Sequence, residues 1–303
     1  MASSSFKGLI SALIVFGIIV GVALLFFYPE FPTEEKEIQA LHAAEKMAEE
    51  NAVHHQEWTF AGMRGHFDKA QLQRGYRVYK EVCAACHGLK LLKYRNLADA
   101  GGPGFTEGQV KTLAAEAEFE IIGDDGTPVA RPGLASDAFK SPFANDNAAR
   151  SANGGALPPD LSVMAKARNV HAEAPWYMAP VQYLKDIVTG YQEGGADYLH
   201  ALLTGYKEKP ASFTVSEGLH FNTAFPGYQI AMPAPLADAQ VEYTDGAPAT
   251  VDQYARDVSA FLTWASEPSL EARKHLGLRV LFYLLITAVI FWLAKRMLWS
   301  RLH

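Results

Sequence analysis

The stretch VYKEVCAACHGLKLLKY, residues 78–94, contains both cysteines of the 303-residue chain, three positions apart, with His87 directly after the second. Such a motif occurs in zinc sites, in redox dithiols and at attachment points of haem. A structural zinc site takes about four ligands, and no further cysteine exists to complete one. A thioredoxin-like dithiol expects a strand before the motif, whereas FDKAQLQRGYRVYKEV upstream has the apolar spacing of a helix with Asp68 as its N-cap.

Haem attachment fits the motif best. On a helix, Cys83 and Cys86 project from one face, where two thioether bonds would hold the edge of a porphyrin. His87 then lies beneath the ring and coordinates the iron. We therefore predict one haem c, bound covalently through two thioethers. Both thiols are consumed in this arrangement, so no disulfide is expected.

A haem iron with histidine on one side needs a sixth ligand, and methionine suits an electron carrier because it raises the reduction potential. Met232 is the leading candidate, since it lies in FPGYQIAMPAPL, a loop stiffened by three prolines. The residues alone leave this choice open. Met164 is expected in the core of a helix, and Met178 is expected in a turn.

Two apolar runs predict membrane helices. Residues 9–28 form twenty positions without a charge, which is long enough to cross a bilayer. A cleaved signal peptide is the alternative, but no small-residue cleavage pattern follows, so a retained anchor is favoured. Residues 276–299 predict a second span with basic residues after it. The positive-inside rule places both termini in the cytoplasm and the region between them on the opposite side of the membrane. In the bacterial inner membrane, where we expect the protein, that side is the periplasm.

The region between the spans is acidic. Residues 30–278 contain all 33 acidic residues but lack five of the 27 basic ones, so their net charge is −11, against −6 for the whole chain. This charge argues against nucleic acid as a partner and favours a basic protein, with a merely soluble surface as the alternative. The run EAEFEIIGDD is a candidate docking face, with a solvated helix end as the alternative. Its acidic residues are Glu116, Glu118, Glu120, Asp124 and Asp125.

The predicted fold is mostly α: a c-type cytochrome domain with long loops around one haem, anchored by a C-terminal and an N-terminal helix. A closing helix is predicted in TVDQYARDVSAFLTWASEP, with Thr250 as its cap and Pro268 at its end. Residues 100–160 show no strong period and are expected to be loops. The predicted segments are an N-terminal anchor or signal (1–28), a polar connector (29–66), a periplasmic haem domain (67–275), a C-terminal transmembrane helix (276–299) and a cytoplasmic tail (300–303).

The chain resembles the cytochrome c1 family, the haem subunits of the cytochrome bc1 complex. FDKAQLQRGYRVYKEVCAACHGL resembles the family's haem-binding opening, and AARSANGGALPPDLSVMAKAR its central block. GGADYLHALLTGY, FPGYQIAMPAPL and the segment from VEYTDGAPAT to RKHLGL resemble the later blocks, in the same order. Together these blocks cover most of residues 67–278.

The resemblance implies roles for particular residues. Cys83 and Cys86 would bear the haem, with His87 and Met232 as axial ligands of its iron. Three residues would lie by the haem propionates: Asn153, Arg168 and Tyr198. Two prolines, Pro158 and Pro159, would pack by the haem face. Gly75 and Tyr79 resemble the glycine–aromatic contact between the first and last helices. No residue is assigned a catalytic role.

The implied function is that of the redox subunit of a ubiquinol–cytochrome c reductase in a respiratory chain. It would relay one electron from the Rieske iron–sulfur protein to a cytochrome c, beside cytochrome b and membrane lipid in a dimeric multisubunit complex. Quinol oxidation itself would occur on other subunits. A stand-alone membrane-anchored carrier and a haem-based sensor are the alternatives. Residues 169–193 separate Arg168 from GGADY and resemble an insertion seen in bacterial members.

Overall fold

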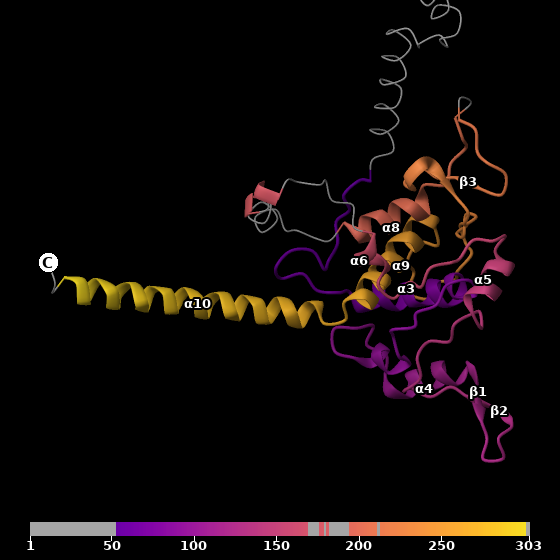
Figure 1. The fold of residues 1–303 in the computed structure, drawn as a ribbon, viewed down its shortest axis with the longest axis horizontal. Helices are drawn as coiled ribbons and strands as arrows, with labels where there is room; N and C mark the ends of the chain where they lie inside the picture. Colours follow the sequence, from indigo (N-terminus) through magenta and orange to yellow (C-terminus); the bar gives the residue numbers. More distant parts are fainter. Residues whose placement is uncertain (1–52, 169–175, 179, 182–193, 211–212, 301–303) are drawn as a thin grey trace, which may run out of the picture. The chain divides into compact units, whose positions relative to one another are not determined.

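The computed structural model describes residues 53–168, 176–178, 180–181, 194–210 and 213–300 (Figure 1). The predicted N-terminal span and most of the predicted insertion lie outside these residues. The α-helices are α3 (Lys69–Glu81), α4 (Glu107–Ala115), α5 (Asp146–Ala152), α6 (Met164–Ala167), α8 (Gly195–Thr204), α9 (Val251–Ser266) and α10 (Leu270–Trp299). Short 3₁₀ helices are η1 (Cys83–Ala85), η2 (Tyr94–Ala98), η3 (Trp176–Met178) and η4 (Pro226–Tyr228). The strands are β1 (Glu118–Ile122), β2 (Pro128–Pro132), β3 (His220–Phe221) and β4 (Gln229–Ile230).

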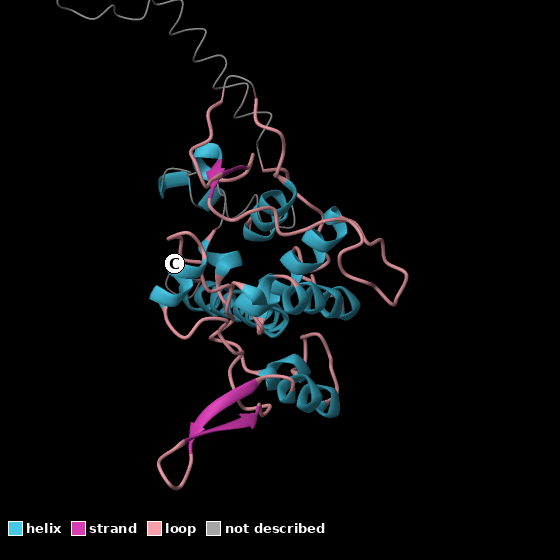
Figure 2. Cartoon of the chain, turned by 90° about the vertical axis from the view of Figure 1, so that its right-hand side faces the viewer, coloured by secondary structure: helices cyan, strands magenta, loops and turns pink. Residues whose placement is uncertain are grey.

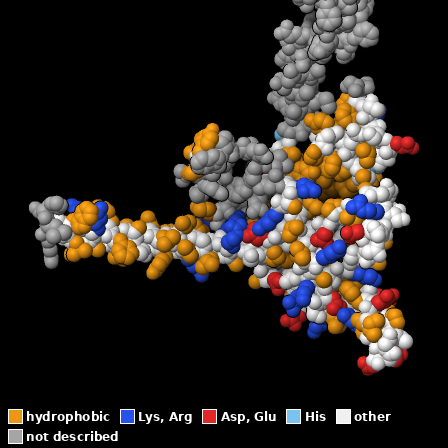
Figure 3. All heavy atoms as spheres, in the orientation of Figure 1, with side chains coloured by type: hydrophobic (Ala, Val, Ile, Leu, Met, Phe, Trp, Pro, Cys, Tyr) orange, Lys and Arg blue, Asp and Glu red, His pale blue; other side chains and the backbone are white. Residues whose placement is uncertain are grey.

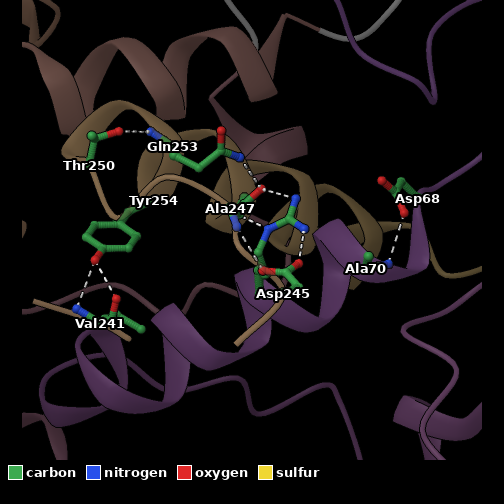
Figure 4. A network of polar contacts seen from close by, with 10 residues as sticks. Asp68, Ala70, Val241, Asp245, Ala247, Thr250, Gln253 and Tyr254 are labelled. Atoms are coloured by element: carbon green, nitrogen blue, oxygen red, sulfur yellow. Dashed lines mark hydrogen bonds and ion pairs between the residues drawn. The ribbon is translucent and has the colours of Figure 1, made fainter. Parts of the chain in front are cut away.

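The centre of the fold is the packing of α3 against α9. Both helices begin at the caps that the sequence predicts: Asp68 accepts from the amide of Ala70, and Thr250 accepts from the amide of Gln253 (Figure 4). A Cβ at Gly75 would lie 2.1 Å from the carbonyl oxygen of Asp257. The two backbones therefore meet at a distance that only glycine allows. The mostly helical fold with few strands confirms the predicted fold class.

Polar groups reinforce this crossing. Asp257 is fully buried and accepts two hydrogen bonds from the guanidinium of Arg74, at 2.8 and 3.2 Å. The same guanidinium donates to Asp245 at 2.7 Å. Tyr254 of α9 uses its hydroxyl to donate to the carbonyl oxygen of Val241 and to accept from the amide of Val241 (Figure 4). A segment without regular structure is thereby fixed to the helix.

The expectation of loops throughout residues 100–160 was wrong in part. Helix α4 begins with a capping box, in which Thr106 and Gln109 bond each other's backbone amides. Strands β1 and β2 then form an antiparallel hairpin that pairs Glu118 with Pro132 and Ile122 with Pro128 (Figure 2). These elements are too short to establish a hydrophobic period, which is why the pattern did not reveal them.

The described end of the predicted connector packs on the domain. Trp58 and Phe60 are buried, and their rings stack with centroids 5.3 Å apart. The indole of Trp58 donates at 2.7 Å to the buried carboxylate of Asp197 in α8, which also accepts from the amide of Gln56 at 3.0 Å. Residues 56–60 thus belong to the same core as the helices.

One helix in the described part of the chain is long and apolar enough to cross a membrane. This is α10, which has 30 residues and a mean hydropathy of 2.2 over its most apolar window. It begins at Leu270, whose side chain is buried in the core, and its large apolar side chains beyond that point are exposed. The structure therefore confirms a C-terminal helix that can anchor the protein in a membrane.

Candidate functional site

The cysteine motif lies just beyond the end of α3. The helix ends at Glu81, and the chain tightens into the 3₁₀ turn η1, where the amides of Cys86 and His87 bond the carbonyl oxygen of Cys83 at 3.1 and 2.9 Å. The prediction that α3 continues through the motif was wrong. In a 3₁₀ turn, residues three apart eclipse each other, so the two cysteines still share a face. Cys86 is exposed and Cys83 is half-buried.

His87 has a fixed orientation. Its Nδ1 lies 2.8 Å from the carbonyl oxygen of Pro159. Because a carbonyl only accepts hydrogen bonds, Nδ1 carries the proton, and the lone pair of the imidazole is on Nε2. Burial lowers the pKa of His87 from its usual 6.5, which favours this neutral form, although the bond to Pro159 and the charge of Asp160 oppose the shift. The ring is therefore prepared to coordinate a metal through Nε2.

The segment that holds this carbonyl is itself bound to the motif loop. Leu161 donates its amide to the carbonyl oxygen of Gly88 at 2.9 Å. Asp160 accepts from the amides of Lys90, at 2.9 Å, and Ser162, at 3.0 Å. The position of Pro159 is thus set by the contacts of the two residues that follow it. Sequence reasoning did not single out Asp160, although an aspartate after two prolines is a common turn-forming residue.

Met232 lies in the segment that follows strand β4. Its side chain is half-buried, and its carbonyl oxygen accepts a hydrogen bond from the hydroxyl of Tyr206 at 3.0 Å. Tyr206 follows α8 and pairs with Asn222 in an antiparallel bridge. The loop that ends at Met232 is therefore tied to α8 by residues that the sequence analysis did not identify.

The three predicted propionate-side residues fall into two groups. Arg168 and Tyr198 lie close enough to interact electrostatically. Burial raises the pKa of Tyr198, and the positive charge of Arg168 lowers it by a smaller amount. Tyr198 is buried in α8, and Arg168 is exposed at the end of α6. Asn153 lies at the end of α5, where its side-chain amide donates to the carbonyl oxygen of Ala149 at 2.7 Å. Its described hydrogen bonds do not link it to the other two.

The donor set fits a c-type haem better than the alternatives. A pocket of about 110 Å³ lies beside Cys86; Leu157 and Pro158 line it together with charged residues such as Lys90 and Asp160, and neither His87 nor Met232 lines it. Hydrophobic side chains gather on the face over α8 toward β3, as an apolar macrocycle requires (Figure 3). Burial, and to a lesser degree Cys86, raise the pKa of the Cys83 thiol to about 12, whereas a redox dithiol needs a lowered one. Within the described ranges, no group of three His, Cys, Asp or Glu residues is placed to hold a metal ion.

These features define a class of protein: a mostly helical domain with a Cys-x-x-Cys-His turn, an oriented histidine and one helix able to anchor it in a membrane. The comparisons identify the family within that class. The profile of the Cytochrome C1 family matches residues 58–302. The chain belongs to the cytochrome c1 family, which makes it a haem-carrying electron-transfer subunit of the bc1 type.

Individual relatives agree with this assignment. The chain is 48% identical over 248 residues to a protein named cytochrome b/c1 from Bradyrhizobium diazoefficiens, an alignment that covers 81% of this chain and 35% of that one. It is 43% identical to cytochrome c1 of Rhodospirillum rubrum, covering 82% of this chain and 88% of that protein. It is also 43% identical to a mitochondrial cytochrome c1 heme protein of Solanum tuberosum, covering 80% and 84%. The chain thus spans about a third of the Bradyrhizobium protein.

Proposed function

We propose that this chain relays single electrons from a Rieske iron–sulfur protein to a cytochrome c, through one haem held by Cys83 and Cys86. His87 and Met232 would hold its iron. The chain acts within a dimeric bc1 complex beside cytochrome b, and ubiquinol is oxidised on the other subunits. The observation that carries the proposal is the bond between His87 Nδ1 and Pro159, because it leaves Nε2 for a metal directly after two cysteines on one face.

The bound haem supplies reversible one-electron reduction of its iron. The residues of this chain hold and tune it. Cys83 and Cys86 would tether the macrocycle, and the carbonyl of Pro159 would orient His87 and make its ring more basic toward the metal. As an iron ligand, Met232 would raise the potential relative to a second histidine. Asn153, Arg168 and Tyr198 would contact the propionates, and Pro158 would pack along the face of the ring.

The acidic docking face is also part of the proposal. Glu118 and Glu120 are exposed on one side of β1, where their cross-strand partners Pro132 and Ala130 are uncharged. Asp124 and Asp125 are exposed in the turn that follows, while Glu116 forms an ion pair with Lys80. A basic cytochrome c would be steered to this face. The rate of electron transfer to the acceptor should therefore fall as ionic strength rises, and a rate independent of salt would contradict the docking face.

We place the haem domain in the periplasm, with residues 1–28 as a retained anchor. The basic residues Lys295 and Arg296 at the end of α10 favour a cytoplasmic C-terminus. Accessibility of a cysteine added after residue 303 to a membrane-impermeant reagent, in spheroplasts and in inverted vesicles, tests this orientation. Labelling in intact spheroplasts would overturn it.

The test of the haem assignment is the optical spectrum of the purified full-length protein, before and after acid–acetone extraction. We expect the haem to stay on the chain and the oxidised protein to show a weak near-infrared methionine–iron band. That band should be lost in Met232→Leu and kept in the control Met63→Leu, which changes an exposed methionine. Haem that is extracted would overturn covalent attachment. A band that survives in Met232→Leu would overturn the axial assignment.

The same preparation separates the rival functions. A bc1 subunit co-purifies with cytochrome b, whereas a stand-alone carrier keeps its function without it. A haem-based sensor requires an open or easily displaced sixth position, so rapid binding of carbon monoxide by the reduced wild-type protein would favour that function over electron relay.

A further inference from the structure

We propose that Tyr206 and Asn222 are positioning residues for the axial methionine: they fix the loop of residues 222–232 onto α8 and so keep Met232 available to the iron. The inference deepens the proposed function and rests on Met232 as the sixth ligand. It is carried by a set of described hydrogen bonds that join this loop to α8 and close the turn within it.

The first contact acts on the methionine itself. The phenol of Tyr206 donates to the carbonyl oxygen of Met232 at 3.0 Å, so it restrains the peptide group that carries the ligand. Tyr206 is held in turn by its position directly after α8. A Cβ at the preceding Gly205 would meet the carbonyl oxygen of Ala201 at 2.7 Å and the hydroxyl of Thr223 at 2.8 Å. The end of α8 and the start of the loop are therefore packed closely together.

The second contact acts on the start of the loop. Asn222 is fully buried, and its side chain donates to the carbonyl oxygen of Leu202 at 2.8 Å. Its side-chain oxygen accepts from the amides of Ala224 and Phe225, at 3.0 and 3.1 Å. Its own amide donates to the carbonyl oxygen of Tyr228 at 3.0 Å. The side chain and backbone amide of this one residue thus join the last turn of α8 to both sides of the loop's tight turn.

The turn needs such support because its backbone is strained. Gly227 has φ 77° and Tyr228 has φ 59°, so two successive residues are in the left-handed region. For a residue other than glycine this conformation costs about 1–2 kcal/mol and persists only where its surroundings impose it. The rings of Phe221 and Tyr228 stack at 6.2 Å, which adds to the polar contacts. The loop is therefore preorganised both by its contacts with the end of α8 and by those within its own turn.

This support determines how firmly the methionine is held. A thioether is a neutral, weak ligand, and an unrestrained loop would lose entropy on each binding event. Removing the hydroxyl of Tyr206 deletes one hydrogen bond and leaves the ring in place. The methionine-bound population should then fall relative to the unbound one. Because methionine ligation raises the potential, the midpoint potential should fall as well.

The experiment uses the full-length oxidised protein, with imidazole added as a competing ligand. In Tyr206→Phe we expect the imidazole concentration that removes half of the near-infrared methionine band to fall about fivefold, the equivalent of one hydrogen bond of about 1 kcal/mol. The midpoint potential should be lower than that of the wild type. Tyr94→Phe is the control, because it removes a hydroxyl from a buried tyrosine that packs on Phe139 instead of this loop, whereas Tyr206 is half-buried.

Three outcomes separate the claims. A band that survives in Met232→Leu would refute the ligand assignment, and with it the premise of this inference. If that variant loses the band but Tyr206→Phe titrates like Tyr94→Phe with an unchanged potential, the positioning role is wrong. If Tyr206→Phe is poorly folded by circular dichroism, Asn222→Ala provides the second variant. In this variant, too, a lower imidazole concentration should remove half of the methionine band. A concentration equal to that of the wild type would again refute the positioning role.

Discussion

The crossing of α3 and α9 and the loop of Met232 are held by different physical means. At the crossing, fully buried side chains and a backbone contact at Gly75 leave no room to adjust. The loop is half-buried and depends on a few hydrogen bonds from Tyr206 and Asn222. The free energy of unfolding should therefore reside mainly in the helix pair, whereas the state of the proposed axial ligand should depend on the loop. Variants can separate the two properties.

The largest effect is expected for Phe261→Ala. Phe261 is fully buried in α9, and its ring lies 5.8 Å from that of Tyr76 and 5.6 Å from that of Trp264. Removing it leaves a cavity at the crossing and should cost about 3–5 kcal/mol. Thermal unfolding followed by circular dichroism should show a large drop in Tm, with the near-infrared band intact below it. The exposed control Leu91→Ala should change stability by less than about 0.5 kcal/mol.

Gly75→Ala should come next. The added methyl would overlap the carbonyl oxygen of Asp257 and lie 2.7 Å from the Cβ of Phe261, so the helices must move apart. Overpacking of this kind costs about 1–3 kcal/mol, and we expect the upper end. In the control Gly108→Ala, on α4, the nearest atom to the new Cβ is 4.0 Å away. That change should be neutral or slightly stabilising in denaturant unfolding, because alanine favours a helix. Equal losses in both variants would contradict the importance of the close contact.

Asn222→Ala tests the loop side of the comparison. It leaves the carbonyl oxygen of Leu202 and the amides of Ala224 and Phe225 without their partner, at a cost of about 1–3 kcal/mol. Because this cost falls on a locally held segment, hydrogen exchange in residues 222–232 should accelerate more than in α3. An equal acceleration in both segments would show that loop and helices open together.

The smallest effect is expected for Asp137→Asn, which changes neither the crossing of α3 and α9 nor the loop of Met232. Asp137 accepts two bonds from Arg131, at 2.6 and 3.0 Å, and these, with the amide of Leu134, lower its pKa from 3.8 to about 2. A lowered pKa stabilises the fold above the unfolded value and ceases to do so as pH falls through the folded value. The variant should be less stable at pH 7 by under about 1 kcal/mol, since the pair is partly solvated. In urea unfolding, this difference should disappear between pH 3.8 and about 2. A difference that persisted below pH 2 would have another cause.

The sequence predicted the helix pair well because its signals are local. Asp68 and Thr250 are strong caps, and apolar residues recur at helical spacing in α3 and α9. The hairpin β1–β2 was missed although a signal was present: Asp125 and Gly126 stand between two short aliphatic runs, a combination that favours a tight turn. The acidic residues of the same run led to the prediction of a docking face, and no strand was predicted there.

The supports of the candidate site could not be predicted in the same way. Asp160 bonds Lys90 across 70 positions, and Tyr206 bonds Met232 across 26. No periodicity links such pairs, since each depends on how loops are folded back on the helices. The resemblance supplied candidates for the ligands, but the residues that orient them became apparent only from their contacts in the folded chain.

The hydroxyl of Tyr254 restricts which amino acids position 254 can accept. The hydroxyl both donates to and accepts from the backbone of Val241, so it makes the two hydrogen bonds that a neighbouring strand would make with this residue. Phenylalanine fills the same volume but offers neither function, and the indole of tryptophan can only donate. Among the aromatic residues, therefore, only tyrosine can make both hydrogen bonds. The backbone of a loop thirteen positions earlier thus restricts which residue can occupy this position in the core.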